Sequence, residues 1–295
     1  MEKSFAPAYR IGSASLLTAA VLTATPAAHA AVMPYVADAD TAALYHLDEP
    51  VGSYSTGSYI TDSSGNGLDL RSPGGGSSPF LGVPGPEGLA TAATFTSATT
   101  RAFRFGSNDI GSNLSFDQFT VEGWVRNPTG TNPTIFYVQD GGASQRLFFR
   151  LNQTTAGAAV QLIYNNQTSG TTFLTSSSRT LLTPDEWYHV AATYDDQGSA
   201  TAGDSVVNLY LTPFSSETPV LVGSFSGLAD VKDLNGSSEL LEIGGSGGNN
   251  GLSGNLDEVR YSNVVRDSFN LNVIPEPGSL ALMSLGALLC IRRRG

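Results

Sequence analysis

Few residues of this chain combine the type and spacing needed for acid–base, nucleophilic or metal chemistry. The sequence holds one cysteine, Cys290, and three histidines, His29, His46 and His189. Closed zinc sites draw four ligands mainly from cysteine and histidine, and no Gly-x-Ser-x-Gly turn marks a serine nucleophile. His46 and His189 fall within apolar runs typical of strands, so we expect both to be structural. These residue types predict neither a zinc site nor a cysteine nucleophile.

The acidic residues expected in strands are isolated from one another. Glycoside hydrolases place two carboxylates across the scissile bond, about 5–5.5 Å apart in enzymes that retain configuration. Glu239 and Glu242 are three residues apart, and because side chains alternate along a strand they point to opposite faces. Glu122 stands alone, and Asp257 is directly followed by Glu258. This arrangement predicts that the protein is not an enzyme.

Each of the two tryptophans has polar neighbours at strand spacing. Trp124 shares a face with Glu122 and Arg126, and Trp187 shares one with His189. Sugar sites pair an apolar platform with a few polar groups, so either tryptophan is a candidate platform. Tryptophans inside sandwich strands more often pack in the core, and we expect that role for both. The sequence therefore identifies no ligand-binding residue.

The chain is acidic, with 26 aspartates and glutamates, 15 lysines and arginines, and a net charge of −11. Setting aside five basic residues and one acidic residue near the two ends leaves 10 basic and 25 acidic residues; those set aside are Lys3, Arg10, Arg292, Arg293, Arg294 and Glu2. A surface of this charge repels phosphate backbones and anionic lipid headgroups. The composition therefore excludes nucleic-acid binding.

Residues 1–30 have the organisation of a secretory signal peptide. Lys3 and Arg10 give a weakly positive start, an uncharged run follows from Ile11 to Leu22, and Ala28-His29-Ala30 supplies the small-x-small pattern for signal peptidase. The run is shorter than the roughly 20 residues of a membrane-spanning helix. We expect export, with cleavage after Ala30.

The C-terminal residues 273–295 contain three distinct parts in order. Pro275-Glu276-Pro277 is followed by an apolar stretch, Gly278–Ile291, and then by Arg292-Arg293-Arg294. The positive-inside rule places these arginines in the cytoplasm. The segment resembles the PEP-CTERM sorting signal of Gram-negative bacteria. That resemblance implies transient membrane retention, removal by an exosortase, and delivery to the cell envelope, surface or extracellular matrix. An ordinary C-terminal anchor is the alternative.

The body, residues 31–272, reads as strands separated by turns. It contains no cysteine, so it must be stabilised by a hydrophobic core, for which it is long enough. No window keeps a helical apolar stripe, and Ser72–Pro86 reads as a long surface loop. We expect a single all-β domain, a two-sheet antiparallel sandwich. The expected strands are Ala43–Leu47, Ala92–Phe95, Ala102–Phe105, Phe119–Arg126, Thr134–Val138, Leu147–Leu151, Val160–Tyr164, Trp187–Tyr194, Val206–Thr212, Val220–Phe225, Leu240–Ile243 and Asn255–Tyr261.

Four segments of the body carry a family resemblance. They are Leu44–Glu49 with Asp62–Gly67, Phe119–Arg126, Glu186–Asp195, and Ile243–Gly245 with Gly254–Asn263. In this order they resemble a laminin G-like jelly roll of the concanavalin A-like lectin/glucanase superfamily, from about residue 41 to residue 270. The resemblance implies a jelly-roll sandwich and carbohydrate binding. Related glucanases use a Glu-x-Asp-x-x-Glu strand, and no strand of this sequence matches that pattern.

The resemblance also implies a structural calcium ion. In related jelly rolls calcium ties the first strand to the last through acidic residues at positions that resemble Asp48, Glu49 and Asp257. Calcium prefers oxygen ligands from carboxylates and carbonyls, which these residues supply. The alternative is that the acids only form hydrogen bonds at strand ends.

Together these features predict an exported, non-catalytic surface or matrix protein. Its expected partners are signal peptidase and exosortase during processing, and glycans, exopolysaccharide or other surface polymers afterwards. A polysaccharide-degrading glycoside hydrolase of the same superfamily is the alternative.

Overall fold

The computed structural model describes residues 31–271 except for 55–58, 73–78, 97–102, 108–109, 111–112, 140–145, 169, 199–202, 234–238 and 247–249. The expected signal segment 1–30 and the sorting residues Pro275, Glu276, Pro277, Arg292, Arg293 and Arg294 lie outside the described residues. In the part of the chain that is described, every regular secondary-structure element is a β-strand. No helix suited to crossing a membrane occurs there.

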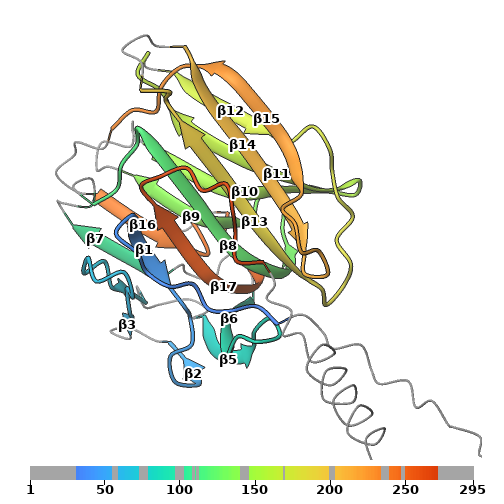
Figure 1. Cartoon of the computed structure of the whole chain (residues 1–295). Helices are drawn as coiled ribbons and strands as arrows, with labels where there is room; N and C mark the ends of the chain where they lie inside the picture. Colours follow the sequence, from blue (N-terminus) through green and yellow to red (C-terminus); the bar gives the residue numbers. More distant parts are fainter. Residues whose placement is uncertain are drawn as a thin grey trace, which may run out of the picture.

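The strands form two antiparallel sheets that lie one behind the other (Figure 1). Sheet I has nine strands, with β1 beside β17 and the others in the order β15 (Leu221–Leu228), β14 (Ser205–Pro213), β13 (Trp187–Asp195), β8 (Gln118–Thr129), β17 (Ser253–Ser262), β6 (Thr91–Thr96), β5 (Phe80–Pro84) and β2 (Gly52–Ser53). β1 spans Thr41–Tyr45. Sheet II has eight strands, in the order β12 (Thr171–Thr175), β11 (Gly157–Asn165), β10 (Arg146–Thr154), β9 (Thr134–Gln139), β16 (Glu239–Ile243), β7 (Phe103–Ser107), β4 (Leu70–Arg71) and β3 (Tyr59–Ile60). The predicted all-β, two-sheet sandwich is confirmed.

Two expectations about local structure were wrong. The stretch expected as a surface loop, Ser72–Pro86, contains β5, because Leu81 is fully buried and pairs with Ala93 of β6. The glycines and prolines around this strand are typical of loops, so the sequence pattern did not predict it. The first strand ends at Tyr45 rather than Leu47, since Leu47 turns the chain with φ = +59° while its side chain stays buried.

A stack of aromatic rings joins the two sheets at the centre of the core. The Phe119 ring of β8 stacks on Tyr261 of β17 at 5.4 Å and on Tyr194 of β13 at 5.0 Å. Phe136 of β9 stacks on the same Tyr261 from sheet II, at 5.4 Å. These side chains are fully buried, and each large apolar side chain removed from water stabilises the fold by about 1.5–3 kcal/mol.

A second hydrophobic cluster covers the outer face of sheet I. The first and last residues of the described domain supply the cover, and we call residues 31–40 and 263–271 the terminal segments. They pack against outward-facing side chains of β1, β6, β8 and β13. The buried members of this cluster are Val32, Tyr35, Leu44, Ala92, Trp124, Trp187, Ala191, Phe269 and Leu271. The central strands of sheet I are therefore buried on both faces.

Gly244 lies at the end of β16, where a side chain would meet the core. Its φ is +77°, and an added Cβ would come within 2.3 Å of the Phe95 ring. Gly67 has the same φ of +77° but nothing within 4 Å of its Cβ position. The two glycines therefore differ in steric surroundings and share a backbone conformation.

We expect Gly67→Ala to lower the free energy of unfolding by about 1–2 kcal/mol, the penalty for a left-handed residue with a Cβ. Gly244→Ala should lower it by a further ~1–3 kcal/mol, because the methyl group overpacks against Phe95. Urea denaturation of both variants measures the difference. Equal losses would show that the Phe95 ring moves aside freely.

Candidate functional site

A β-bulge in β17 brings the acidic and basic residues of that strand to one face. Relative to β8, the register shifts between Asp257, which pairs with Trp124, and Arg260, which pairs with Glu122. The extra residue is Glu258, with φ = +49°. Without the bulge, Asp257 and Arg260 would point to opposite faces, because they are three residues apart. The bulge places both on the outer face of sheet I.

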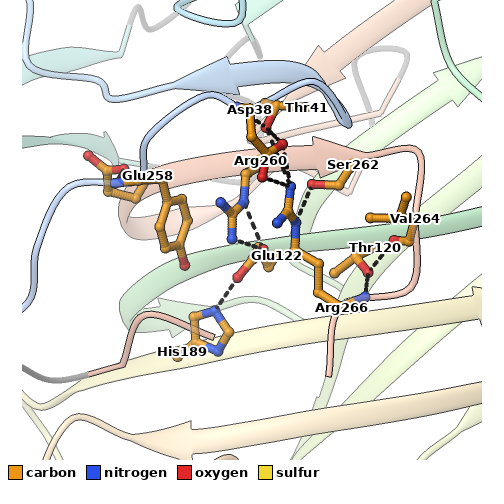
Figure 2. Close-up of polar contacts among 11 residues, drawn as sticks. Asp38, Thr41, Thr120, Glu122, His189, Glu258, Arg260, Ser262, Val264 and Arg266 are labelled. Carbon is orange, nitrogen blue, oxygen red and sulfur yellow. Dashed lines mark hydrogen bonds and ion pairs between the residues drawn. The ribbon is translucent and has the colours of Figure 1, made fainter. Parts of the chain in front are cut away.

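Arg260 and His189 hold the carboxylate of Glu122 from two sides (Figure 2). Arg260 donates to Glu122 Oε1 from Nε at 2.9 Å and from Nη2 at 2.7 Å. His189 Nε2 donates to Oε2 at 2.9 Å. All three side chains are buried. They come from β8, β13 and β17, so the contacts join three neighbouring strands.

The N-terminal segment closes this network. The ring of Tyr35 lies 4.2 Å from the guanidinium carbon of Arg260, and the backbone NH of Tyr35 donates to Glu258 Oε2 at 2.9 Å. The other oxygen of Glu258 accepts a hydrogen bond from His46 Nδ1 at 2.7 Å. The network therefore runs from β8 through β17 to the chain that follows β1.

The C-terminal segment is tied to the N-terminal one by Arg266. Its Nη2 donates to both oxygens of Asp38, at 2.8 and 2.9 Å, and its backbone NH donates to Thr120 Oγ1 at 2.8 Å (Figure 2). The ring of Phe269 lies 5.0 Å from that of His189. Both terminal segments thus cover the same face.

Burial and charge act in opposite directions on Glu122. Burial by itself raises the pKa of Glu122, but the hydrogen bond from His189 and the charge of Arg260 outweigh it and hold the pKa below its usual value. The hydrogen bond to Glu258 raises the pKa of His46. Burial, and next the charge of Glu122, raise the pKa of Tyr35. The buried negative charge of Glu122 is therefore balanced by the positive charge of Arg260 and the hydrogen bond from His189.

This enclosed network does not have the form of an active site. Both oxygens of Glu122 are engaged and the residue is fully buried. Trp124 and Trp187 are buried as well, with 0% and 6% of their surface exposed, so the expectation that both are core residues is confirmed. Neither tryptophan offers a platform to a sugar.

The residues predicted to hold calcium are only partly brought together. Asp257 is fully buried, its Oδ1 accepts the NH of Glu258 at 3.0 Å, and its Oδ2 has no partner among the described residues. Burial, and then the charges of Glu258 and Asp48, raise the pKa of Asp257 well above its usual value. Glu49 uses Oε1 to accept the NH of Thr61 at 2.8 Å.

The described residues hold no group of three or more acidic, histidine or cysteine side chains able to bind a metal. The orphaned, buried oxygen of Asp257 and the nearby charge of Asp48 fit a hard cation. Its other ligands would then be backbone carbonyls and water. Glu49 has the same pattern, because its Oε1 accepts a backbone hydrogen bond while its Oε2 is buried with no partner among the described residues.

The outer face of sheet II carries a different set of side chains, at the β10–β11–β12 edge. Two adjacent cross-strand rows lie there, one apolar and one polar, and we call them together the outer patch. The apolar row is Phe148, Ile163 and Phe173, and the polar row is Arg150, Gln161 and Thr175. Directly paired residues share a face, so all six side chains point away from the core.

The two rows differ in what they offer to a ligand. Phe173 is 64% exposed on the edge strand β12. In the polar row, Arg150 Nε donates to Gln161 Oε1 at 2.6 Å, and Gln161 Nε2 donates to Thr175 Oγ1 at 2.7 Å. The sequence analysis missed these residues. Alternation marks Phe148 and Phe173 as outward-facing, but only the register aligns them.

We expect Glu122→Gln to lower the free energy of unfolding by about 3–5 kcal/mol near neutral pH, because Arg260 loses its buried counterion. The folded pKa of Glu122 lies below its unfolded value of about 4.3. Its stabilisation is therefore present above that pH and lost as the pH falls through the folded pKa. Urea denaturation should show the gap between variant and wild type closing in acid.

Asp38→Asn is the matched control, because the Asp38 side chain is 47% exposed and pairs with Arg266. An exposed ion pair contributes less than about 1 kcal/mol. Losses of equal size in the two variants would contradict the central role of Glu122.

Residues 97–268 match the family model for the concanavalin A-like lectin/glucanases superfamily, and residues 273–294 match the PEP-CTERM protein-sorting motif. Such a motif indicates export to the surface of a bacterial cell or beyond it, with processing by exosortase. None of the curated proteins matches the chain in sequence.

Several solved structures are similar. One is domain 4 of an extracellular GH43 arabinanase from Geobacillus stearothermophilus, in complex with arabinotriose, with 18% identity, a TM-score of 0.48, and 76% of this chain and 92% of that chain covered. Another is the sialidase CBM40 of Ruminococcus gnavus bound to α2,3-sialyllactose, with 14% identity, a TM-score of 0.41, and 60% and 91% covered. A pentraxin from Limulus polyphemus has 14% identity, a TM-score of 0.38, and 59% and 76% covered.

The family match takes in more than half of the chain and includes β8, β13 and β17, the strands that build the buried network. The chain belongs to the concanavalin A-like lectin/glucanase superfamily and ends in a PEP-CTERM protein-sorting motif.

Proposed function

We propose that this protein is an exported, non-catalytic surface or matrix protein that binds carbohydrate through the outer patch. The observation that carries the proposal is the pairing of an apolar row, which ends in the exposed Phe173, with a parallel polar row on the outer face of sheet II. Sugars have the same division, since their rings present apolar CH faces and their rims present hydroxyl groups.

The chemistry of the outer patch fits this class of ligand. Binding sites combine apolar and aromatic surface with a few placed polar groups. Phe173 supplies exposed aromatic surface that the core does not use, and Arg150, Gln161 and Thr175 supply donors and acceptors beside it. A large apolar side chain on an edge strand otherwise invites unwanted strand pairing, which a ligand would prevent.

The absence of a carboxylate among the six residues of the outer patch supports binding rather than hydrolysis. A retaining or inverting glycosidase needs two carboxyl groups at the sugar. Elsewhere on the outer face of sheet II, Glu242 is 1% exposed and paired with Arg104. A reducing-sugar assay on each bound polysaccharide tests the alternative, a glycoside hydrolase.

The proposed route to the surface uses both ends of the chain. Signal peptidase would cleave near Ala30, and the segment Gly278–Ile291 would hold the precursor in the membrane until exosortase acts near Pro275-Glu276-Pro277. Val32 and Leu271 belong to one cluster on the outer face of sheet I. The signal peptidase site would therefore lie just before, and the exosortase site just after, segments that pack on the same face, away from the outer patch.

We also propose that calcium binds at Asp257 and Asp48 as a structural ion. An ionised Asp257 is unfavourable without a cation, because it is buried next to the charges of Glu258 and Asp48. A divalent cation would offset that repulsion and tie the chain after β1 to β17.

Phe173→Ala should weaken glycan binding by about tenfold, because a buried aromatic contact contributes roughly 1.5 kcal/mol. Glycan-array binding followed by calorimetry on the strongest hit measures it. Leu181→Ala is the control, since Leu181 is 74% exposed but lies outside the outer patch. Equal binding by wild type and Phe173→Ala would overturn the assignment of the site.

Asp257→Asn should have effects of opposite sign with and without calcium. The folded pKa of Asp257 is raised, so its ionisation destabilises the fold as the pH rises above the unfolded value of about 3.9. In EDTA at neutral pH the variant should therefore melt at a higher temperature than wild type.

With calcium at a hundredfold excess over Kd, wild type should gain about 2.7 kcal/mol, which corresponds to roughly 5–10 °C for a domain of this size. Asp257→Asn should gain nothing, and the exposed Glu217→Gln should behave as wild type. A wild-type melting temperature that is the same in EDTA and in calcium would show that no site exists. If wild type is stabilised by calcium, a smaller calcium-dependent rise in the melting temperature of Glu49→Gln would show that Glu49 is the third ligand.

A further inference from the structure

We propose that the ligand of the outer patch is an anionic polysaccharide, whose carboxylate or sulfate groups pair with Arg150. This inference rests on the proposed carbohydrate-binding function and names the class of carbohydrate. Three observations support it: an uneven distribution of charge, an arginine without a counterion, and the spacing of further arginines along the same face.

The outer face of sheet II carries more positive than negative side chains in the rows described here, whereas the whole protein is negatively charged. The chain has a net charge of −11. One uninterrupted cross-strand row nevertheless reads Tyr59, Arg71, Arg104, Glu242, Tyr137, Phe148, Ile163 and Phe173, each directly paired with the next. With Arg150 in the adjacent row, three arginines face one glutamate there. The face is locally positive on an acidic molecule.

Arg150 is half-buried and, unlike Arg260 and Arg104, has no acidic partner in the described chain. Arg260 pairs with Glu122, and Arg104 pairs with Glu242. Within the described chain, the contacts of Arg150 are the hydrogen bond to Gln161 and the face of the Phe148 ring, 5.8 Å from the guanidinium carbon. Burial lowers the pKa of Arg150, and no carboxylate counteracts it. An anionic ligand would supply the missing counterion.

The chemistry of the guanidinium group favours carboxylate or sulfate. Arginine offers five N–H donors in a planar fork, and Nε is the one engaged in a described hydrogen bond. The fork matches two oxygens of one anionic group in a bidentate contact. The exposed ring of Phe173 in the adjacent row offers aromatic surface to the CH face of a sugar, which favours an acidic sugar over an acidic peptide.

The spacing of the arginines favours a polymer. β7 lies three strands from β10, and β4 lies four strands away. At about 4.8 Å per strand, Arg104 and Arg71 are roughly 14 and 19 Å from Arg150 along the sheet. A single sugar cannot reach across that distance. A chain with repeated anionic groups laid across the strands would meet Arg150 and Arg71 and pass over Arg104, which already pairs with Glu242.

The test compares anionic polymers with neutral counterparts of the same backbone. The pairs are polygalacturonate and its methyl ester, dextran sulfate and dextran, and carboxymethyl cellulose and hydroxyethyl cellulose. The purified full chain should bind at least one anionic member about tenfold or more tightly than its counterpart, the size expected for a charge-assisted bidentate contact. The preference should weaken at high salt.

Arg150→Gln should remove this preference while leaving the binding of the neutral member unchanged, and Arg150→Lys should keep part of it. Arg126→Gln is the matched control. Arg126 also stacks on an aromatic ring, that of Trp187 at 4.8 Å, and points Nε at an amide oxygen, but it lies on the other sheet. Circular dichroism and melting temperature of each variant confirm that it is folded.

The outcomes separate this inference from the proposed function. Equal binding of charged and neutral members, or a preference that survives in Arg150→Gln, overturns the anionic class and leaves carbohydrate binding intact. Binding of poly-glutamate as tight as that of the best polysaccharide overturns the choice of a glycan. Failure of every polysaccharide, neutral ones included, overturns both proposals.

Discussion

The buried carboxylate of Glu122 is the constraint on which the outer half of this molecule depends. A charge removed from water needs a counterion and further hydrogen bonds, because its desolvation costs several kcal/mol. Arg260 and His189 meet that need from the two strands that flank β8. Arg260 reaches Glu122 because the bulge at Glu258 turns it to the outer face. One local irregularity in β17 thus makes a buried ion pair possible.

The same ion pair gives a reason for the terminal segments to cover sheet I. Tyr35 shields Arg260 and Phe269 packs on His189, so water is kept from the network by residues near the start and end of the domain. The pairing of Arg266 with Asp38 joins the two covering segments. Fold and processing are linked through this arrangement, since the sorting motif begins at residue 273, directly after the C-terminal segment. Removal of the tail beyond that point leaves the cover intact.

Covering one sheet leaves the other to meet the surroundings. On sheet I the outward-facing aromatic residues Trp124 and Trp187 are buried beneath the terminal segments. On sheet II, Phe173 is exposed on the edge strand β12, and the hydrogen-bonded Arg150 and Gln161 lie on the two strands next to it, half-buried and buried respectively. The outer face of sheet I therefore closes the domain, and the outer face of sheet II is where we propose that recognition takes place. An acidic surface elsewhere would direct an anionic polymer toward the positive face.

The sequence by itself determined the all-β class, most of the long strands and the C-terminal sorting motif, because alternation, turn residues and apolar runs are local properties. It also indicated that Trp124, Trp187 and His189 are structural. It could not reveal the bulge at Glu258, since a bulge depends on the register against β8, and the rule of alternation then misplaces Asp257 relative to Arg260. It could not align Phe148 with Phe173 or Arg150 with Gln161 either. Cross-strand pairing joins residues far apart in the chain, and only the tertiary structure decides which of them meet.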